Sequence, residues 1–230
     1  MQELHPRLKA AAAMVPPGST VADIGTDHAY LPAYLLLNGV CPRAIACDIG
    51  EKPLQNAAET VKIYHLDGKI DLRVSDGLEK VSPEEYNAAT ICGMGGTLIA
   101  QILEKADLPA DVRLILQPMT HAEDVRMWLC GHGFAIGREV CVADAGRVYC
   151  CMVAARGDDP RKDEPGYWYF GSLSGETAEE RAMIRKTYDR VKTRADALAE
   201  AYRYPEEQAL LRQVLTYYEQ HYDNYRKRRL

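Results

Sequence analysis

The stretch Thr20–Leu31, which reads TVADIGTDHAYL, decides the fold of this chain. Its first half is a short apolar, β-branched run directly after the turn signal PPG at residues 16–18, so it predicts a buried strand. Gly25 comes where that strand must turn. Pro32 suits the first turn of a helix, because the N–H that proline lacks would be unpaired there anyway. A strand, a tight glycine turn and a helix form the opening unit of a nucleotide-type α/β fold.

The turn itself differs from the dinucleotide fingerprint, which uses three glycines to bring the backbone against a pyrophosphate. Only Gly25 is present here, and Asp27 and either Ala29 or Tyr30 fill the other two positions. Asp27 would place a negative charge where a diphosphate should bind. Asp23 and Asp27 instead favour a cofactor that carries positive charge and an amino-acid ammonium group, which describes S-adenosylmethionine.

Composition predicts one α/β core with something smaller attached. The chain has 230 residues, 47% of them hydrophobic, and no apolar run approaches the roughly 18–20 residues of a membrane span. The first residues, MQELHP, resemble neither a signal nor a transit peptide, so we expect a cytoplasmic protein. The seven cysteines include no C-x-x-C pair, which favours buried reduced thiols over a metal site, and we predict no metal.

The formal net charge of −5 is unevenly distributed. Residues 1–171 carry a net charge of −7, whereas residues 172–230 carry +2 and end in a basic cluster. A polyanionic partner would therefore be recruited by local patches, chiefly by this tail. The alternative is that the basic run only keeps the protein soluble. Its members are Arg226, Lys227, Arg228 and Arg229.

The order of the expected elements is that of a class I, Rossmann-like methyltransferase sheet with helices on both faces. After the strand at 20–24, apolar runs predict strands at 44–49, 70–74, 88–92 and 113–117. Expected helices cover 2–15, 29–37, 97–105 and 125–130, with one more after residue 51. A hairpin signal at 144–146 then joins strands at 134–143 and 147–155, so the last strand should enter antiparallel.

Three of these strands end in residues suited to a ligand. Asp48 ends the second strand 23 residues after Gly25, about where a carboxylate meets ribose hydroxyls, although it could merely cap a helix. Asp76, followed by Gly77, ends the third strand and could bind an adenine amino group, or form only a turn. The glycine-rich segment 93–96 ends the fourth strand and predicts a backbone that passes close to a ligand.

The remaining sequence predicts three parts, with domain boundaries at 1–157, 158–175 and 176–230. The middle part is a linker by its Gly and Pro content, although its aromatic run at 167–170 should pack against one domain. In the last part, apolar and tyrosine residues recur every three or four positions on both sides of the breaker Tyr204-Pro205. The expected seam residues are Ile184, Tyr188, Val191, Ala195, Leu198 and Tyr202 before it, and Leu211, Leu215, Tyr218, Tyr222 and Tyr225 after it. This spacing predicts an antiparallel, coiled-coil-like helical hairpin, either binding a partner or only packing on itself.

Together these motifs resemble one family. The segments ADIGTDHAYLP at 22–32, GMGGTLI at 93–99 and LILQP at 114–118, with LHPRL at 4–8, are similar to the bacterial TrmK family. Its members are tRNA (adenine-N1)-methyltransferases that act on the adenine at position 22. The resemblance implies S-adenosylmethionine as cofactor and tRNA as partner. Two departures are PMTH at 118–121 and Asp48, where relatives more often have a glutamate.

The resemblance and the strand-end pattern together give the predicted site. The expected catalytic residues are Asp27, His28 and Tyr30, since a carboxylate would stabilise the cationic product base and the rings would stack on it or hydrogen-bond to it. The expected cofactor-binding residues are Asp23, Gly25, Asp27, His28, Ala29, Leu31, Asp48, Ile49, Asp76, Gly77, Gly93, Met94, Gly95 and Gly96. The expected substrate-binding residues are Arg7, Gln117, Pro118 and the four basic residues of the tail.

Other functions remain open on the sequence alone. The same fold could methylate a protein or a small molecule, with the hairpin as a dimerisation device, but that would leave the basic tail unexplained. A non-catalytic RNA-binding protein on this fold is disfavoured by the intact acidic and glycine positions. A dehydrogenase is disfavoured by the missing glycines.

Overall fold

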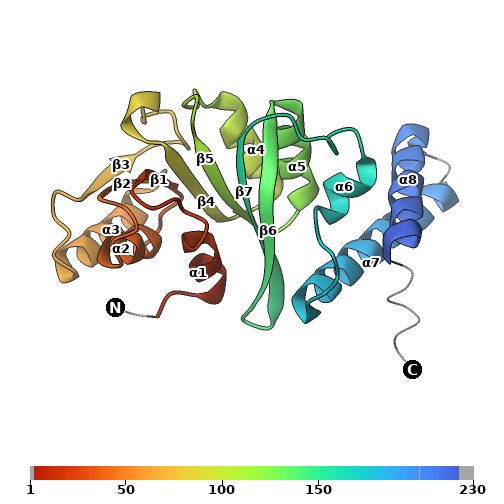
Figure 1. Ribbon diagram of the computed structural model, residues 1–230, viewed down its shortest axis with the longest axis horizontal. Helices are drawn as coiled ribbons and strands as arrows, with labels where there is room; N and C mark the ends of the chain where they lie inside the picture. Colours follow the sequence, from red (N-terminus) through yellow and green to blue (C-terminus); the bar gives the residue numbers. More distant parts are fainter. Residues whose placement is uncertain (1–2, 202, 223–230) are drawn as a thin grey trace. The chain divides into compact units, whose positions relative to one another are not determined.

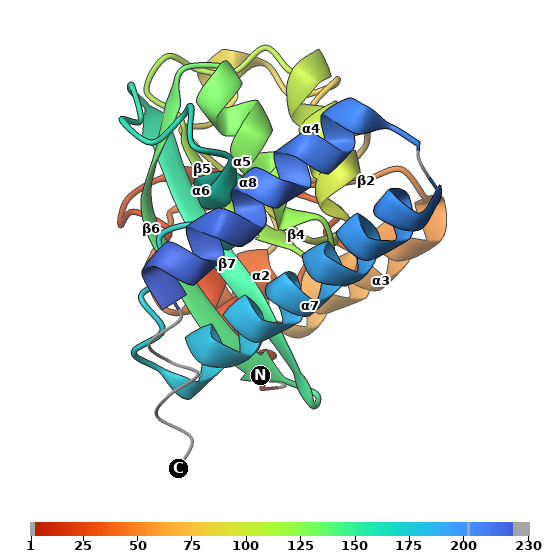
Figure 2. The same ribbon diagram turned by 90° about the vertical axis from the view of Figure 1, so that its right-hand side faces the viewer.

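The computed structural model describes residues 3–201 and 203–222. The chain divides after Asp159 into two compact units. Figures 1 and 2 show the elements of both units. Among the described residues, no helix combines the length and apolar character that a membrane crossing needs.

The first unit is built on a seven-stranded sheet in the order β3-β2-β1-β4-β5-β7-β6 (Figure 1). Strand β7 runs antiparallel to its neighbours β5 and β6, and all other pairings are parallel. This confirms the predicted class I methyltransferase sheet with its reversed last strand. The strands are β1 (Thr20–Ile24), β2 (Arg43–Asp48), β3 (Ile70–Val74), β4 (Ala88–Met94), β5 (Arg113–Pro118), β6 (Phe134–Asp144) and β7 (Arg147–Arg156).

Two groups of helices cover the sheet (Figure 1). One group packs together from α1 (Pro6–Ala12), α2 (Tyr30–Leu37) and α3 (Glu51–Ile63), and the other pairs α4 (Gly96–Lys105) with α5 (Ala122–Gly131). A short 3₁₀ turn, η1 (Pro83–Glu85), precedes β4. Helix α1 is shorter than the predicted 2–15. It begins with a proline at its first position, and its helical turns end at Ala12, before the turn that leads to residues 16–18.

One core cluster lies between α1–α3 and the sheet, and Cys41 and Cys151 contribute to it. Its members include the small and branched residues of β1 and β2, which are almost fully buried. All seven cysteines are free, and five of them are buried. Burial raises the pKa of Cys41 to about 11 and that of Cys47 to about 12. Such thiols stay protonated and unreactive at neutral pH.

A buried ion pair holds the β6 strand against α5. Arg126 of α5 is 1% exposed, and its Nε donates to Oε1 of Glu139 at 2.8 Å. The Glu139 side chain is itself buried. Removing one partner would leave an uncompensated buried charge, which costs about 3–5 kcal/mol. The contact therefore fixes the strand whose last residue is Asp144.

The second unit is helical. Helices α7 (Ala178–Ala201) and α8 (Pro205–Tyr222) form the predicted hairpin and lie side by side in Figure 2. The buried seam includes Tyr188, whose ring stacks on that of Tyr218 at 4.1 Å between centroids. On α8 the seam uses Val214, which is fully buried, where the spacing predicted Leu215. Tyr202 and Tyr225, also predicted for the seam, lie outside the described residues.

The predicted linker contains a third helix, α6 (Pro165–Phe170), which belongs to the helical unit. Its aromatic run packs on α8, as expected for a segment too apolar to be free. The ring of Phe170 lies 5.5–6.1 Å from the rings of Tyr217, Tyr218 and Tyr222. Gly166 is required by this packing, because a Cβ there would overlap the ring of Tyr217.

Candidate active site

Apart from Arg7 of α1, the predicted site residues of the first unit lie at or just after the carboxyl ends of β1 to β5, where open α/β sheets bind ligands. Asp23, on β1, is 4% exposed and accepts two hydrogen bonds. The hydroxyls of Thr26 and Thr90 donate to its two carboxylate oxygens, each at 2.6 Å. Burial raises the pKa of Asp23, which the two hydrogen bonds partly offset. Asp23 thus joins β1 to β4 and anchors the turn that follows β1.

That turn is held to β2 and contains backbone strain. The N–H groups of Gly25 and Thr26 both donate to the carbonyl of Cys47 at 2.9 Å. Gly25 has φ 70°, and two residues other than glycine, Asp27 and Ala29, have φ 53°. Left-handed conformations cost these residues about 1–2 kcal/mol each. Strain of this kind persists where the surroundings fix the backbone, as they often do at functional sites.

Asp48, the last residue of β2, contacts the turn that follows β1. Its Oδ2 accepts from the backbone N–H of Asp27 at 3.2 Å, and its Oδ1 accepts from that of Gly50 at 3.1 Å. The next residue, Ile49, is 73% exposed, which is unusual for a large apolar side chain. A carboxylate with an exposed isoleucine beside it suits a nucleoside, whose ribose offers hydroxyl donors and whose base offers an apolar face.

The three residues expected to be catalytic lie together between the end of β1 and the first residue of α2. Nε2 of His28 is 3.7 Å from Oδ1 of Asp27, and the Asp27 side chain is 67% exposed. The rings of His28 and Tyr30 stack with centroids 5.1 Å apart and planes 4° from parallel. The arrangement presents one carboxylate next to a flat aromatic pair. By contrast, Ala29 and Leu31 are buried in the core, so any cofactor contact would use their backbone.

The glycine-rich segment 93–96, at the end of β4, contains glycines with different surroundings. Gly93 has φ 83°, which favours glycine, and Gly95 would hold a Cβ no closer than 3.4 Å to Oγ1 of Thr120. Gly96 is different, because a Cβ there would overlap the backbone carbonyl of His121. Its N–H also donates to the carbonyl of Thr120 at 2.8 Å. Packing of the β5–α5 loop is thus sufficient to explain Gly96, and its contact with the cofactor stays a prediction, as it does for Gly93 and Gly95.

Met94, between Gly93 and Gly95, is the last residue of β4 and packs against the turn that follows β1. Its backbone carbonyl accepts from the N–H of Met119 at 2.8 Å. Its side chain lies against Gly25, where a Cβ would collide with it. Flexible methionine side chains adapt to neighbouring shapes, so Met94 can adjust to what lies between β1 and β4.

Arg7 and Gln117, both predicted to bind substrate, contact each other. Nη1 of Arg7 donates to Oε1 of Gln117 at 3.0 Å. Gln117 is fully buried, and its Nε2 donates to the carbonyl of Pro118, a buried residue, at 3.1 Å. Both the oxygen and the nitrogen of the Gln117 amide are therefore bonded within the chain. Gln117 holds Arg7 in place.

Asp144 is a residue that the sequence did not single out for this site. Its Oδ2 is 3.4 Å from Nε of Arg7, and its Oδ1 is 3.5 Å from Nδ1 of His5. In the sequence it is only the first residue of a hairpin signal. No local pattern could have linked it to the first helix.

Asp76 and Gly77 lie after β3 and pack towards α4. Oδ2 of Asp76 is 3.6 Å from Nζ of Lys105, and about half of the Asp76 side chain is exposed. Gly77 has φ 58°, and a Cβ there would press on the side chain of Ile102 at 2.7 Å. Gly77 is thus explained by packing and turn geometry, and the adenine contact of Asp76 stays a prediction.

One group in the described part of the chain brings three metal-type ligands together, namely His121, Glu123 and Asp124. Nδ1 of His121 is 3.3 Å from Oε1 of Glu123, and Oγ1 of Thr97 donates to Asp124 at 2.5 Å. These contacts satisfy the group without an ion, at the first turn of a helix where acidic residues are common.

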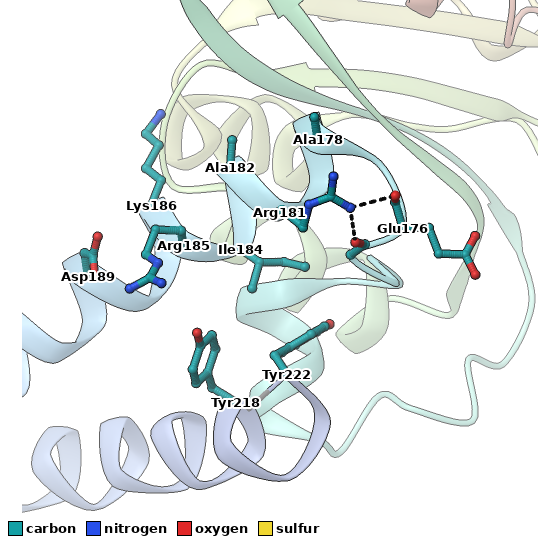
Figure 3. Close-up of a pocket in the computed structure, with 11 residues that line it drawn as sticks. Glu176, Ala178, Arg181, Ala182, Ile184, Arg185, Lys186, Asp189, Tyr218 and Tyr222 are labelled. Carbon is teal, nitrogen blue, oxygen red and sulfur yellow. Dashed lines mark hydrogen bonds between the residues drawn. The ribbon is translucent and has the colours of Figure 1, made fainter. Parts of the chain in front are cut away.

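The helical unit has a cavity of about 1240 Å³ between α7 and α8 (Figure 3). Arg181 is held at its edge, because Nη1 donates to the carbonyls of Gly175 at 2.9 Å and Glu176 at 2.7 Å. Arg185 and Lys186 also line it and are exposed, and neither pairs with another residue that the structure describes. The predicted tail contacts at Arg226, Lys227, Arg228 and Arg229 lie outside the described residues.

Comparison with known proteins decides the family. A family model described as "Methyltransferase domain" matches residues 4–152. The crystal structure of the Bacillus subtilis m1A22 tRNA methyltransferase TrmK superposes with a TM-score of 0.81 and 33% identity, covering 94% of this chain and 100% of that chain. The chain belongs to the TrmK family. This confirms the resemblance found in the motifs.

A curated sequence and a second solved structure bear on substrate and cofactor. The B. subtilis enzyme named "tRNA (adenine(22)-N(1))-methyltransferase" is 44% identical over 158 residues, which span 68% of this chain and 66% of that enzyme. A Streptococcus pneumoniae structure is described as a putative tRNA (m1A22) methyltransferase in complex with S-adenosyl-L-methionine. It has a TM-score of 0.75 and 34% identity, and covers 91% of this chain and 98% of that chain.

Proposed function

We propose that this chain transfers the methyl group of S-adenosylmethionine to N1 of an adenine in tRNA, at position 22 as in its relatives. The observation that carries the proposal is the hydrogen bond from the N–H of Asp27 to Oδ2 of Asp48. This bond links Asp48, the carboxylate suited to a ribose, with the segment that contains Asp27, His28 and Tyr30. A cofactor site and a base site would thereby be adjacent. A cytoplasmic location is part of the proposal, because tRNA is found there.

The residues at the strand ends fit the cofactor. Asp48 offers acceptors to ribose hydroxyls, and the exposed side chain of Ile49 offers an apolar surface to adenine. Asp27 and the buried Asp23 make this end of β1 acidic, as an ammonium and a sulfonium require. When bound, S-adenosylmethionine supplies an electrophilic methyl group.

The chemistry asks the protein mainly for positioning. Adenine N1 has a lone pair in the ring plane, so it needs no general base before it attacks a methyl group in line. The methylated base is a cation. The carboxylate of Asp27 would stabilise this developing charge, while the stacked rings of His28 and Tyr30 offer a flat surface to the base. The adenine must leave its stack to reach the site, which costs a few kcal/mol.

The test is methylation of an unmodified tRNA transcript by the purified chain, followed by nucleoside mass spectrometry. The proposal expects N1-methyladenosine from the normal transcript and none from a transcript with guanine at position 22. Asp27→Asn should lower kcat by about 10²-fold or more, in line with losses of one charge-stabilising group. A methylated protein or small molecule in place of tRNA would contradict the proposal and favour the alternative substrate class.

Contact between the helical unit and tRNA forms the second part of the proposal. Arg185 and Lys186 are two exposed, unpaired cations beside the cavity of α7 and α8, within the described part of the chain. In the sequence, the basic tail begins four residues after Tyr222, which also lines that cavity. Phosphates are the partner that such a set of cations attracts most strongly.

Salt dependence tests this contact. The Arg185→Ala/Lys186→Ala variant should weaken tRNA binding and reduce the slope of log affinity against log salt by up to about 0.7–0.9 for each phosphate that the variant no longer neutralises. A truncation after Tyr225 should act in the same direction. Lys62→Ala/Lys69→Ala, which changes two exposed lysines of the first unit, is the control. Equal slopes for all variants would assign the α7 and tail cations to ordinary solvated surface.

A further inference from the structure

Asp144 is a buried carboxylate that has no role in the proposed methyl transfer. It ends β6, and its side chain is 7% exposed. Its two oxygens each face a nitrogen of the N-terminal segment, Nδ1 of His5 at 3.5 Å and Nε of Arg7 at 3.4 Å. A carboxylate with so little access to water requires compensating charge nearby. Arg7 supplies it, and Asp144 in turn fixes the Nε edge of that guanidinium.

Arg7 is held from three strands at once. Besides the contact with Asp144 of β6, its Nη1 donates to Gln117 of β5 at 3.0 Å. Its backbone carbonyl accepts from Sγ of Cys151, on β7, at 3.4 Å. Nη2 of Arg7 donates to no residue that the structure describes, and the side chain is 22% exposed. One end of a rigidly held guanidinium is therefore available to a ligand.

The Arg7 guanidinium lies beside Gly93, near the end of β4. Its Nη1 is 3.4 Å from where a Cβ on Gly93 would be. The N–H of Gly93 donates to the same Oε1 of Gln117 that accepts from Arg7. Arg7 is thus part of the carboxyl edge at which cofactor and base are proposed to meet.

We propose that Asp144 is a positioning residue, which orients Arg7 so that Nη2 binds a phosphate oxygen of the nucleotide to be methylated. This rests on the proposed function. A phosphate is favoured over the base itself, because the methylated adenine is a cation and a guanidinium next to it would raise its energy. A guanidinium also matches phosphate oxygens in geometry and charge.

A double-mutant cycle tests the role of Asp144. KM for a tRNA transcript and kcat are measured at saturating S-adenosylmethionine for Asp144→Asn, Arg7→Ala and the double variant. Asp144→Asn should raise KM for tRNA about 5- to 30-fold, the range of coupling between contacting charged groups, and change kcat by less than about threefold. In the Arg7→Ala background the same change should alter KM by less than about twofold. Asp144→Glu should restore part of the loss.

Asp71→Asn is the matched control. Asp71 is likewise a carboxylate paired with an arginine, since its Oδ2 lies 2.6 Å from Nη2 of Arg73, but it belongs to β3. It should leave KM for tRNA unchanged. Calorimetry should give all variants the same affinity for S-adenosylmethionine. A general collapse of the site would lower that affinity.

Two results would overturn the role of Asp144: equal effects of Asp144→Asn with and without Arg7, or a matching loss of cofactor affinity. If Asp144→Asn does not fold, Arg7→Lys is measured in its place. A lysine keeps the positive charge but has a single nitrogen, so it cannot contact Asp144, Gln117 and a phosphate in the way that Nε, Nη1 and Nη2 of Arg7 can. An unchanged KM for Arg7→Lys would then reject the proposal.

Filter binding of tRNA without cofactor separates this proposal from the proposed function. If the wild-type chain binds tRNA but forms no N1-methyladenosine, the proposed function fails, and the same cycle in Kd still decides the role of Asp144. Equal Kd values for all variants would reject that role.

Discussion

The side-chain oxygen of Gln117 accepts a hydrogen bond from the backbone N–H of Gly93 at 3.1 Å, which ties the end of β5 to the glycine turn of β4. The same oxygen accepts from Arg7. One buried amide therefore sets the conformation of the turn and the position of the cation beside it.

Gln117→Leu should destabilise the fold by about 1–3 kcal/mol, because it leaves the Gly93 N–H and an Arg7 nitrogen without their acceptor. Denaturant unfolding measures the change. Gln55→Leu, an exposed position on α3, should change stability by no more than about 0.5 kcal/mol. Equal stability of the Gln117 variant and the wild type would show that water replaces the missing acceptor.

Asp48→Ala should weaken S-adenosylmethionine binding by about 1.5–3 kcal/mol, the value of a hydrogen bond to a charged group. Isothermal titration calorimetry measures the affinity. Asp48→Asn keeps one acceptor oxygen and should lose less. An unchanged affinity in the alanine variant would remove Asp48 from the cofactor site and leave it as the acceptor for Asp27 and Gly50 alone.

Asp23 should make the stability of the unliganded protein depend on pH. Because burial raises its folded-state pKa, its contribution is fully present below the unfolded pKa of about 3.9 and is lost as pH rises through the folded value. Asp23→Asn cannot titrate. It should therefore be destabilising relative to wild type near pH 4 and become less so, or stabilising, towards pH 7.

Urea unfolding at a series of pH values measures this difference. Asp67→Asn, at an exposed position, serves as the control and should give a difference that does not vary with pH. A constant difference for Asp23→Asn as well would mean that the folded carboxyl titrates near its ordinary pKa. The buried hydroxyl contacts would then stabilise the charged form fully.

Gly96→Ala should cost about 1–3 kcal/mol of stability, because its Cβ would overlap the backbone carbonyl of His121, which cannot move as a side chain tip can. Gly95→Ala, whose nearest neighbour is the Thr120 hydroxyl at 3.4 Å, should stay within about 1 kcal/mol of wild type. Thermal unfolding compares the two. Similar stabilities would show that the β5–α5 loop can shift.

The strands, their sequence along the chain and the turn that follows β1 could be predicted from the sequence. Each of these depends on residues close together in the chain. A short β-branched run after a turn signal favours a buried strand, and Gly25 permits a left-handed turn directly after it. The motif at 93–99 likewise placed a turn at the end of β4, although it could not show that Gly96 packs against His121.

Tertiary structure alone decided which buried polar groups meet. Arg7 of α1 contacts both Gln117 of β5 and Asp144 of β6, two strands that the sheet order β5-β7-β6 brings to the same edge. The seam of α8 shifted to Val214 for a similar reason, since packing against α7 sets which face is covered. Periodicity reports that a residue faces the interior. It carries no information about the partner, because that depends on the register and order of elements far apart in the chain.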